Sequence, residues 1–190
     1  MNKILLVLLF LLFAEAGFAQ MDTVVTNLPM VDGKLVYSGS VNITGRDSIA
    51  LDSTANNWLK SYFKYHRPCP SPPVEATTGS ISSQAVLEYK VKPGLINIPY
   101  YGIINILITC KNNSYSYKIY DIHFRPKSGT LNAIGYERNP EYLIVLYKQK
   151  HIGLIQSMSI DRHEIRNYLS NMNSAVLECI ASLKKAMTNK

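Results

Sequence analysis

Three cysteines and four histidines are the residues of this 190-residue chain best suited to chemistry. Cys69 lies close to His66, and a thiol beside an imidazole base is what nucleophilic catalysis by cysteine requires. Prolines around Cys69 stiffen the segment, so we expect no catalytic pair here. An active site would have to assemble in three dimensions, with two or more of His66, Cys69, Asp121 and His123 in one pocket. We therefore assign no catalytic residue from the sequence.

Metal ligands must be clustered, and Asp161, His163 and Glu164 form the closest group. His163 and Glu164 are neighbours on an expected helix, where consecutive side chains point about 100° apart, so they do not readily share an ion. Asp161 and Glu164 instead have the spacing of a helix capping box. Motifs for zinc proteases, dithiol sites, nucleophile elbows and nucleotide phosphates are absent. We expect neither a metal nor another cofactor.

The cysteines occur in an odd number, which leaves at least one thiol unpaired within the chain. Cys110 and Cys179 lie on apolar faces of expected elements, which favours buried packing. Two alternatives stay open for them: separate thiols, or a disulfide that would tie the last helix to the sheet. A disulfide between Cys110 and Cys179 would leave Cys69 as the free thiol.

The N-terminus predicts the compartment. Lys3 is followed by an unbroken apolar run over 4–13 and by small residues that end at Ala19. This is the architecture of a secretory signal peptide, residues 1–19, cleaved between Ala19 and Gln20. The run is shorter than the ~20 apolar residues of a membrane span, and no later run reaches that length. We expect a mature chain that is exported to the periplasm or secreted, with no transmembrane span once the signal is removed.

The composition is that of a folded domain, with 47% hydrophobic and 17% charged residues. The formal net charge is +7, and apart from Lys184, Lys185 and Lys190 the basic residues are scattered. Two alternatives stay open for this charge: a solvated surface, or peripheral contact with anionic surfaces such as lipid headgroups. Export argues against nucleic acid as a partner.

Several regular elements must position these residues. An extended lead-in over 20–33 precedes apolar residues that alternate with polar ones over 35–43, which predicts a half-buried strand. Asp47 or Ser48 can cap the helix that follows, which carries an apolar stripe from Leu51 to Phe63 and is expected to end near Tyr65.

A proline-rich stretch over 67–73 then predicts a stiff, exposed connector. Alternating patterns predict three further strands, over 81–91, 100–111 and 114–124. Asn112 and Asn113 suit a tight hairpin, because asparagine tolerates left-handed backbone angles. The apolar parity changes between Ile119 and Tyr120, which indicates a β-bulge.

The stretch 126–160 has a less regular pattern of apolar and polar residues, and we interpret it as an insertion. Asn139 and Pro140 are typical of a helix start, although the apolar run 143–147 also fits a buried strand; we favour the helix. From Ile165 to Met187, apolar residues step by three or four, which predicts a long amphipathic helix that covers the sheet.

The resulting order is strand, helix, three strands, helix. Each strand has one polar face and each helix one apolar stripe, which predicts an α+β domain over 34–190. Its antiparallel sheet would have the helices packed on one face and water on the other.

Further residues extend this pattern. Leu28 and Pro29 precede the segment 32–37, Trp58 and Leu59 lie in the helix, and 78–81 opens the next strand. Together with the Asn-rich hairpin and the tyrosine-rich strand after it, this arrangement resembles an exported bacterial domain-of-unknown-function family described as having a TATA-binding-protein-like fold. The resemblance covers about residues 28 to 125 and implies a curved sheet backed by helices. It implies no activity.

These observations favour an exported, non-enzymatic envelope protein that uses its sheet face to bind an envelope protein or a surface ligand. The alternative is a hydrolase-type enzyme whose residues meet only in three dimensions. Nucleic-acid binding rests on the fold name alone and would need a contiguous basic band on the sheet face.

Overall fold

The computed structural model describes residues 25, 27–74, 76, 79–91, 98–127, 139–148 and 162–189. The predicted signal peptide and its cleavage site at Ala19 and Gln20 lie outside these residues. So do Asp161 and much of the stretches 20–33 and 126–160. No helix within the described ranges is long and apolar enough to cross a membrane.

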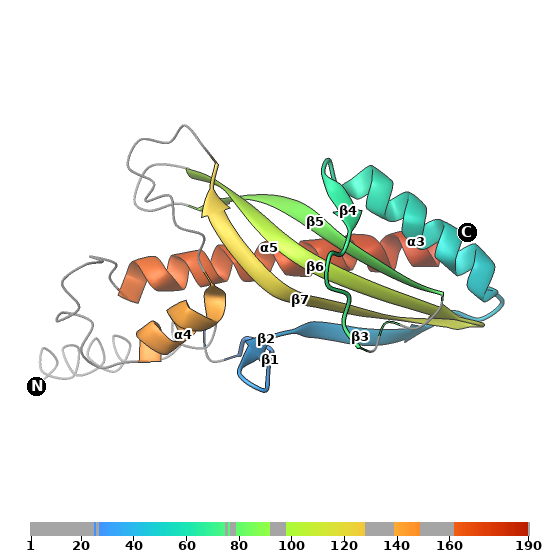
Figure 1. The fold of residues 1–190 in the computed structure, drawn as a ribbon, viewed down its shortest axis with the longest axis horizontal. Helices are drawn as coiled ribbons and strands as arrows, with labels where there is room; N and C mark the ends of the chain where they lie inside the picture. Colours follow the sequence, from blue (N-terminus) through green and yellow to red (C-terminus); the bar gives the residue numbers. More distant parts are fainter. Residues whose placement is uncertain are drawn as a thin grey trace, which may run out of the picture.

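A five-stranded antiparallel sheet forms the centre of the molecule, in the order β3-β7-β6-β5-β4 (Figure 1). Its strands are β3 (Tyr37–Asn42), β4 (His66–Pro68), β5 (Ser80–Val91), β6 (Ile98–Lys111) and β7 (Ser114–Pro126). A small two-stranded sheet precedes it, made of β1 (Met30–Val31) and β2 (Lys34–Leu35). The helices are α3 (Ser48–Tyr62), α4 (Pro140–Lys148) and α5 (Arg162–Thr188). The predicted α+β class, with helices on one side of an antiparallel sheet, is confirmed.

The core lies between the sheet and α5, which runs behind the strands in Figure 1. From β6, Ile104, Ile106 and Ile108 face it and are at most 1% exposed. The apolar seam predicted for the last helix is buried throughout: Ile165, Leu169, Met172, Val176, Cys179, Leu183 and Met187. Burial of these faces supplies the main driving force that holds the helix on the sheet.

Helix α3 begins as predicted and ends earlier than predicted. Asp47 Oδ1 accepts a hydrogen bond from Ala50 N at 2.7 Å, which confirms the cap. The helix stops at Tyr62 rather than near Tyr65. The reason is tertiary, because Val86 N donates to Tyr65 O and draws this residue toward the sheet edge.

The connector predicted over 67–73 begins as an edge strand, which corrects that prediction. His66–Pro68 pairs antiparallel with Ser83–Ala85 of β5. Pro68 is tolerated because an edge strand needs no donor on its outer side.

The hairpin and the bulge are both confirmed. Asn113 has φ 62°, in the left-handed region that the turn requires. The bulge lies opposite Ile103–Asn105 and contains Asp121, whose φ is 51°. Buried positions on β7 accordingly change from odd numbers up to Ile119 to even numbers from Ile122.

The segment 140–148 is a helix, so the alternative of a buried strand is wrong. Asn139 Oδ1 caps it by accepting a hydrogen bond from Glu141 N at 2.8 Å. Glu141 Oε1 in turn accepts from Leu35 N at 2.8 Å and ties α4 to β2.

Candidate binding surface

The sheet face turned away from the helices carries a continuous row of hydrogen-bonded side chains. Arg67 Nε and Nη2 both donate to Gln84 Oε1, at 3.0 and 2.6 Å. Gln84 Nε2 donates to Asn105 Oδ1 at 3.2 Å, and Asn105 Nδ2 donates to Asp121 Oδ2 at 3.1 Å. Asp121 Oδ1 lies 3.0 Å from His123 Nε2. We call these five residues the polar row and this side of the sheet the open face.

The polar row follows from the strand register. Arg67 lies directly opposite Gln84, and Gln84 lies directly opposite Asn105. Directly opposed residues of antiparallel strands have Cβ atoms about 4.5–5.5 Å apart, within reach of a hydrogen bond between side chains. The bulge then shifts β7 so that Asp121 reaches Asn105. The row therefore links four neighbouring strands.

Asn105 is the buried centre of the row. It is only 4% exposed, and its amide both accepts from Gln84 and donates to Asp121. A buried amide without partners would cost free energy, so these bonds hold both neighbours in defined positions.

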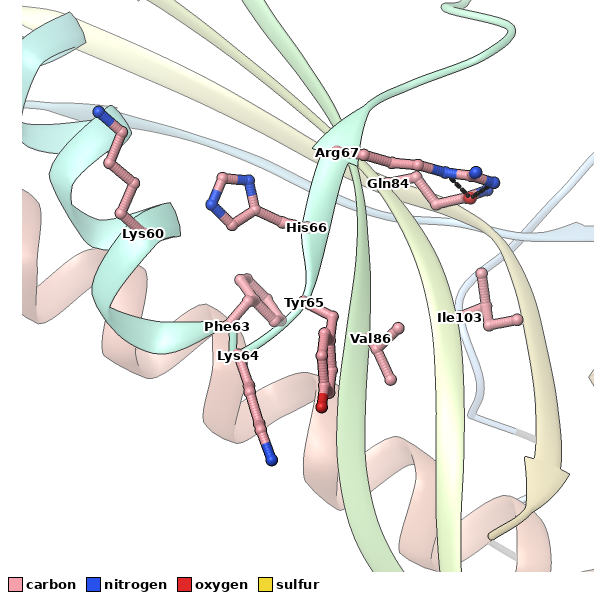
Figure 2. Close-up of a pocket in the computed structure, with 9 residues that line it drawn as sticks. All are labelled: Lys60, Phe63, Lys64, Tyr65, His66, Arg67, Gln84, Val86 and Ile103. Atoms are coloured by element: carbon pink, nitrogen blue, oxygen red, sulfur yellow. Dashed lines mark hydrogen bonds between the residues drawn. The ribbon is translucent and has the colours of Figure 1, made fainter. Parts of the chain in front are cut away.

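A pocket of about 600 Å³ opens where the α3–β4 connection meets the open face (Figure 2). Its lining is Lys60, Phe63, Lys64, Tyr65, His66, Arg67, Gln84, Val86 and Ile103. In Figure 2, Lys60 and His66 lie on the α3 side of β4, whereas Arg67 and Gln84 extend over the strands. The polar row thus ends in the pocket wall.

The pocket is basic. Lys60, Lys64 and Arg67 line it together with His66, and none of the described lining residues is a carboxylate. The ion pairs that the described residues form lie elsewhere, between His123 and Asp121 and between Lys127 and Glu88. Lys64 Nζ instead lies 5.2 Å from the ring centroid of Tyr65.

The connector after β4 crosses the open face. Cys69 N donates to Ser82 O on β5 at 3.2 Å, and Cys69 Sγ lies 3.6 Å from Tyr120 Oη on β7. Figure 1 shows the connector in front of β6 and β7. Burial, reinforced by the Cys69 thiol, raises the pKa of Tyr120 above its ordinary value. Leu107 of β6, the strand between β5 and β7, has its side chain on this face and is only 6% exposed. The open face is therefore partly covered, not wholly wet as the sequence predicts.

The four residues considered for an active site are only partly brought together. His66 is the one that lines the pocket. Asp121 and His123 form a hydrogen-bonded pair on the open face, with side chains 58% and 32% exposed. Cys69 faces Tyr120. The predicted condition for an enzyme, two or more of the four in one pocket, is not met by this pocket.

All three cysteines are free thiols in the structure. Cys110 is half-buried beside Asp52, whereas Cys179 is buried on α5. Burial raises the pKa of each of these two thiols to about 12. A disulfide between Cys110 and Cys179 stays a prediction, and non-reducing mass mapping that finds Cys110 unpaired would exclude it.

The acidic and histidine side chains at the start of α5 have local partners. Glu164 Oε1 accepts from Tyr168 Oη at 3.1 Å, and His163 Nδ1 lies 3.4 Å from Asn167 Nδ2. Within the described ranges, no group of three His, Cys, Asp or Glu residues is arranged to hold a metal ion.

Sequence reasoning missed the polar row. Its faint signal is Asn105, a polar residue inside the apolar stretch 103–108. The pocket was missed as well, and its signal is the group of basic residues Lys60, Lys64 and Arg67 at the end of a helix and just after it. Neither signal shows which side chains meet, because the strand register is not readable from local patterning.

The fold places the protein in a structural class, that of TATA-binding-protein-like folds. A TBP-like protein from Parabacteroides distasonis ATCC 8503 superimposes with a TM-score of 0.62 at 16% identity, covering 85% of this chain and 97% of that one. A DUF4468 family protein from Bacteroides ovatus ATCC 8483 gives the same TM-score and identity, covering 86% of this chain and 91% of that one.

These likenesses confirm the predicted TATA-binding-protein-like fold. They also support the resemblance to a bacterial family of unknown function. No family model matches the sequence, and no curated protein matches it. At 16% identity the likeness extends to the fold and not to a function.

Proposed function

We propose that this chain is an exported, non-enzymatic binding module that engages an envelope protein or a surface ligand through its open face. One observation carries the proposal: the polar row presents ordered donors and acceptors across four strands. Side chains that are already held by their neighbours lose little rotamer freedom when a ligand docks, so more of the contact energy appears as affinity.

The side chains beside the row suit recognition. Tyr101 lies on the open face opposite Glu88. Lys127 Nζ is 5.3 Å from the centroid of the Tyr101 ring. Tyr65, at the pocket, is 54% exposed. Tyrosine and arginine are enriched among the residues that dominate binding energy at interfaces.

Mixed charge on this face argues against nucleic acid. Lys118 and Arg125 of β7 lie on the same face as Glu88, and Asp121 stands between them along the chain. A contiguous basic band would be needed to follow a phosphate backbone. We therefore do not expect an extended polyanion as the partner.

A hydrolase is the second candidate, and the Asp121–His123 pair favours it. A catalytic triad consists of a nucleophile, a histidine base and a carboxylate that orients the imidazole, and this pair would supply the last two. The pair is, however, substantially exposed, and electrostatic catalysis works best in a site that excludes water. An assay with chromogenic esters, phosphoesters and peptides tests it. Turnover that His123→Ala abolishes would establish the enzyme and overturn the proposal.

Site-specific photo-crosslinking in intact cells tests the binding module. The crosslinker replaces Tyr101 or Lys118 on the open face, and a matched control carries it at Leu177, which is 50% exposed on α5. We expect a discrete crosslinked species from the open-face positions that is absent from the control. Arg67→Glu, which breaks the first bonds of the polar row, should weaken it. Crosslinks from α5 alone would show that the open face is not the binding surface.

A further inference from the structure

We infer that the pocket at the end of the polar row binds a small organic oxyanion, a carboxylate or phosphate group on an apolar body. This inference rests on the proposed function and deepens it, because the pocket and the row share Arg67 and Gln84. It names the chemistry that the open face recognises.

The pocket's size favours a small molecule over a macromolecular surface. Small-molecule sites usually enclose about 300–1,000 Å³, whereas protein interfaces are flatter and larger. The volume of about 600 Å³ lies within the first range.

Its charge favours an anion. Four side chains that carry or can carry positive charge line the cavity, Lys60, Lys64, His66 and Arg67. Among the described residues, none of these four forms an ion pair with a carboxylate. Uncompensated like charges repel one another, and an anionic ligand relieves that repulsion.

Arg67 is prepared for an oxyanion. Gln84 Oε1 accepts from both Nε and Nη2 and so fixes the plane of the guanidinium. In the described part of the chain, Nη1 makes no hydrogen bond and can donate to a ligand. A guanidinium held in one plane is well suited to carboxylate and phosphate oxygens.

The rest of the lining suits an apolar body. Phe63, Tyr65, Val86 and Ile103 contribute hydrophobic surface. Figure 2 shows Tyr65 and Val86 close together, next to the basic side chains. An inorganic ion would leave this surface in contact with water, so an anion attached to an organic group gains more from burial.

NMR titration of the isotopically labelled mature chain tests the inference. The probes are phenyl phosphate and benzoate, with inorganic phosphate and neutral benzyl alcohol as controls. We expect one or both organic anions to shift the backbone amides of 60–67 and 84–86 and to bind at least about tenfold more tightly than either control. The phosphate and carboxylate arms tell the two oxyanions apart.

Substitutions locate the binding. Lys60→Gln with Lys64→Gln, and separately Arg67→Gln, should each weaken the preferred probe about threefold to tenfold. Val86→Trp should occupy part of the cavity and weaken binding of the preferred probe. The matched control, Lys111→Gln with Lys185→Gln, removes the same charge at exposed positions outside the lining and should leave the affinity unchanged.

Several outcomes would overturn the inference. One is that benzyl alcohol binds as tightly as the anions. Another is that the shifted amides lie outside the pocket. The third is that the control variant loses as much probe affinity as the pocket variants. Open-face crosslinks to a protein, with no probe binding, would reject the oxyanion and leave the binding module standing. Probe binding without open-face crosslinks would support the oxyanion and reject a protein partner for the open face.

Discussion

Asp121 shows how one residue can determine both the backbone and the surface. Its φ of 51° makes the bulge that changes the buried parity of β7. Its two carboxylate oxygens separately contact Asn105 and His123. Aspartate and asparagine are among the few residues that adopt left-handed angles at low cost. The same side chain therefore permits the bulge and joins the polar row.

Replacing Asp121 by Val should lower the free energy of unfolding by about 1–3 kcal/mol, because a β-branched residue is strained at positive φ. Asp121→Asn tolerates that φ and keeps one acceptor, so it should cost less than about 1 kcal/mol. Urea denaturation of the two variants measures the difference. Equal losses would show that the bulge geometry does not depend on this residue.

Cys179 should make the stability sensitive to alkaline pH. Burial raises the pKa of its thiol from 9.0 to about 12, so the folded state holds this proton more tightly than the unfolded chain does. The resulting stabilisation is complete below about pH 9 and is lost as the pH rises toward 12. We expect the urea midpoint to be level between about pH 7 and 8.5 and to fall above pH 9.

Cys179→Ala is the comparison for the alkaline profile. It removes the thiol, so its midpoint should fall less steeply with pH than that of the unmodified chain. Burial also raises the pKa of Tyr62 and Tyr115 to about 12, so part of the alkaline slope should persist. Parallel profiles for the two proteins would exclude a contribution from Cys179.

At the scale of elements, α5 and the sheet depend on each other. The helix carries a long apolar seam and packs against the sheet, α3 and α4. Trp58 Nε1 of α3 donates to Ser182 Oγ of α5 at 3.2 Å. The sequence predicts this seam correctly. It does not predict β4, because a proline-rich strand of three residues gains its hydrogen bonds only from a partner already in place.

Leu169 and Leu177 provide a matched pair on α5. Leu169 is fully buried, whereas Leu177 is 50% exposed. Leu169→Ala should lower the free energy of unfolding by about 2–5 kcal/mol through lost burial and a new cavity. Leu177→Ala should change it by no more than about 0.5 kcal/mol. Similar losses in the two variants would contradict the packing of α5 on the sheet.

At the scale of the whole molecule, the two faces of the sheet differ in what covers them. One face is buried under the helices, and the other combines the polar row, the basic pocket and the connector through Cys69. This division suits a scaffold that presents a surface. Our proposal adds that the surface works outside the cytoplasm.

Export predicts a defined N-terminus. Mature protein from its native cells should begin at Gln20 and fractionate with the periplasm or the medium. Ala19→Arg places a large charged residue before the cleavage site and should leave a longer, unprocessed chain. Edman sequencing and mass measurement of both proteins provide the test. Native protein that keeps Met1 and fractionates with the cytosol would contradict export.

The sequence by itself determined the elements whose signals are local. The alternation on β5, β6 and β7, the seam of α5, the Asp47 cap and the Asn113 turn all follow from residues a few positions apart. The expected export signal is of the same kind. Only the tertiary structure decided that Arg67, Gln84, Asn105 and Asp121 form one row, because strand order and register depend on contacts between distant segments. The pocket has the same origin, since its walls meet only after α3 and β4 have docked against β5 and β6.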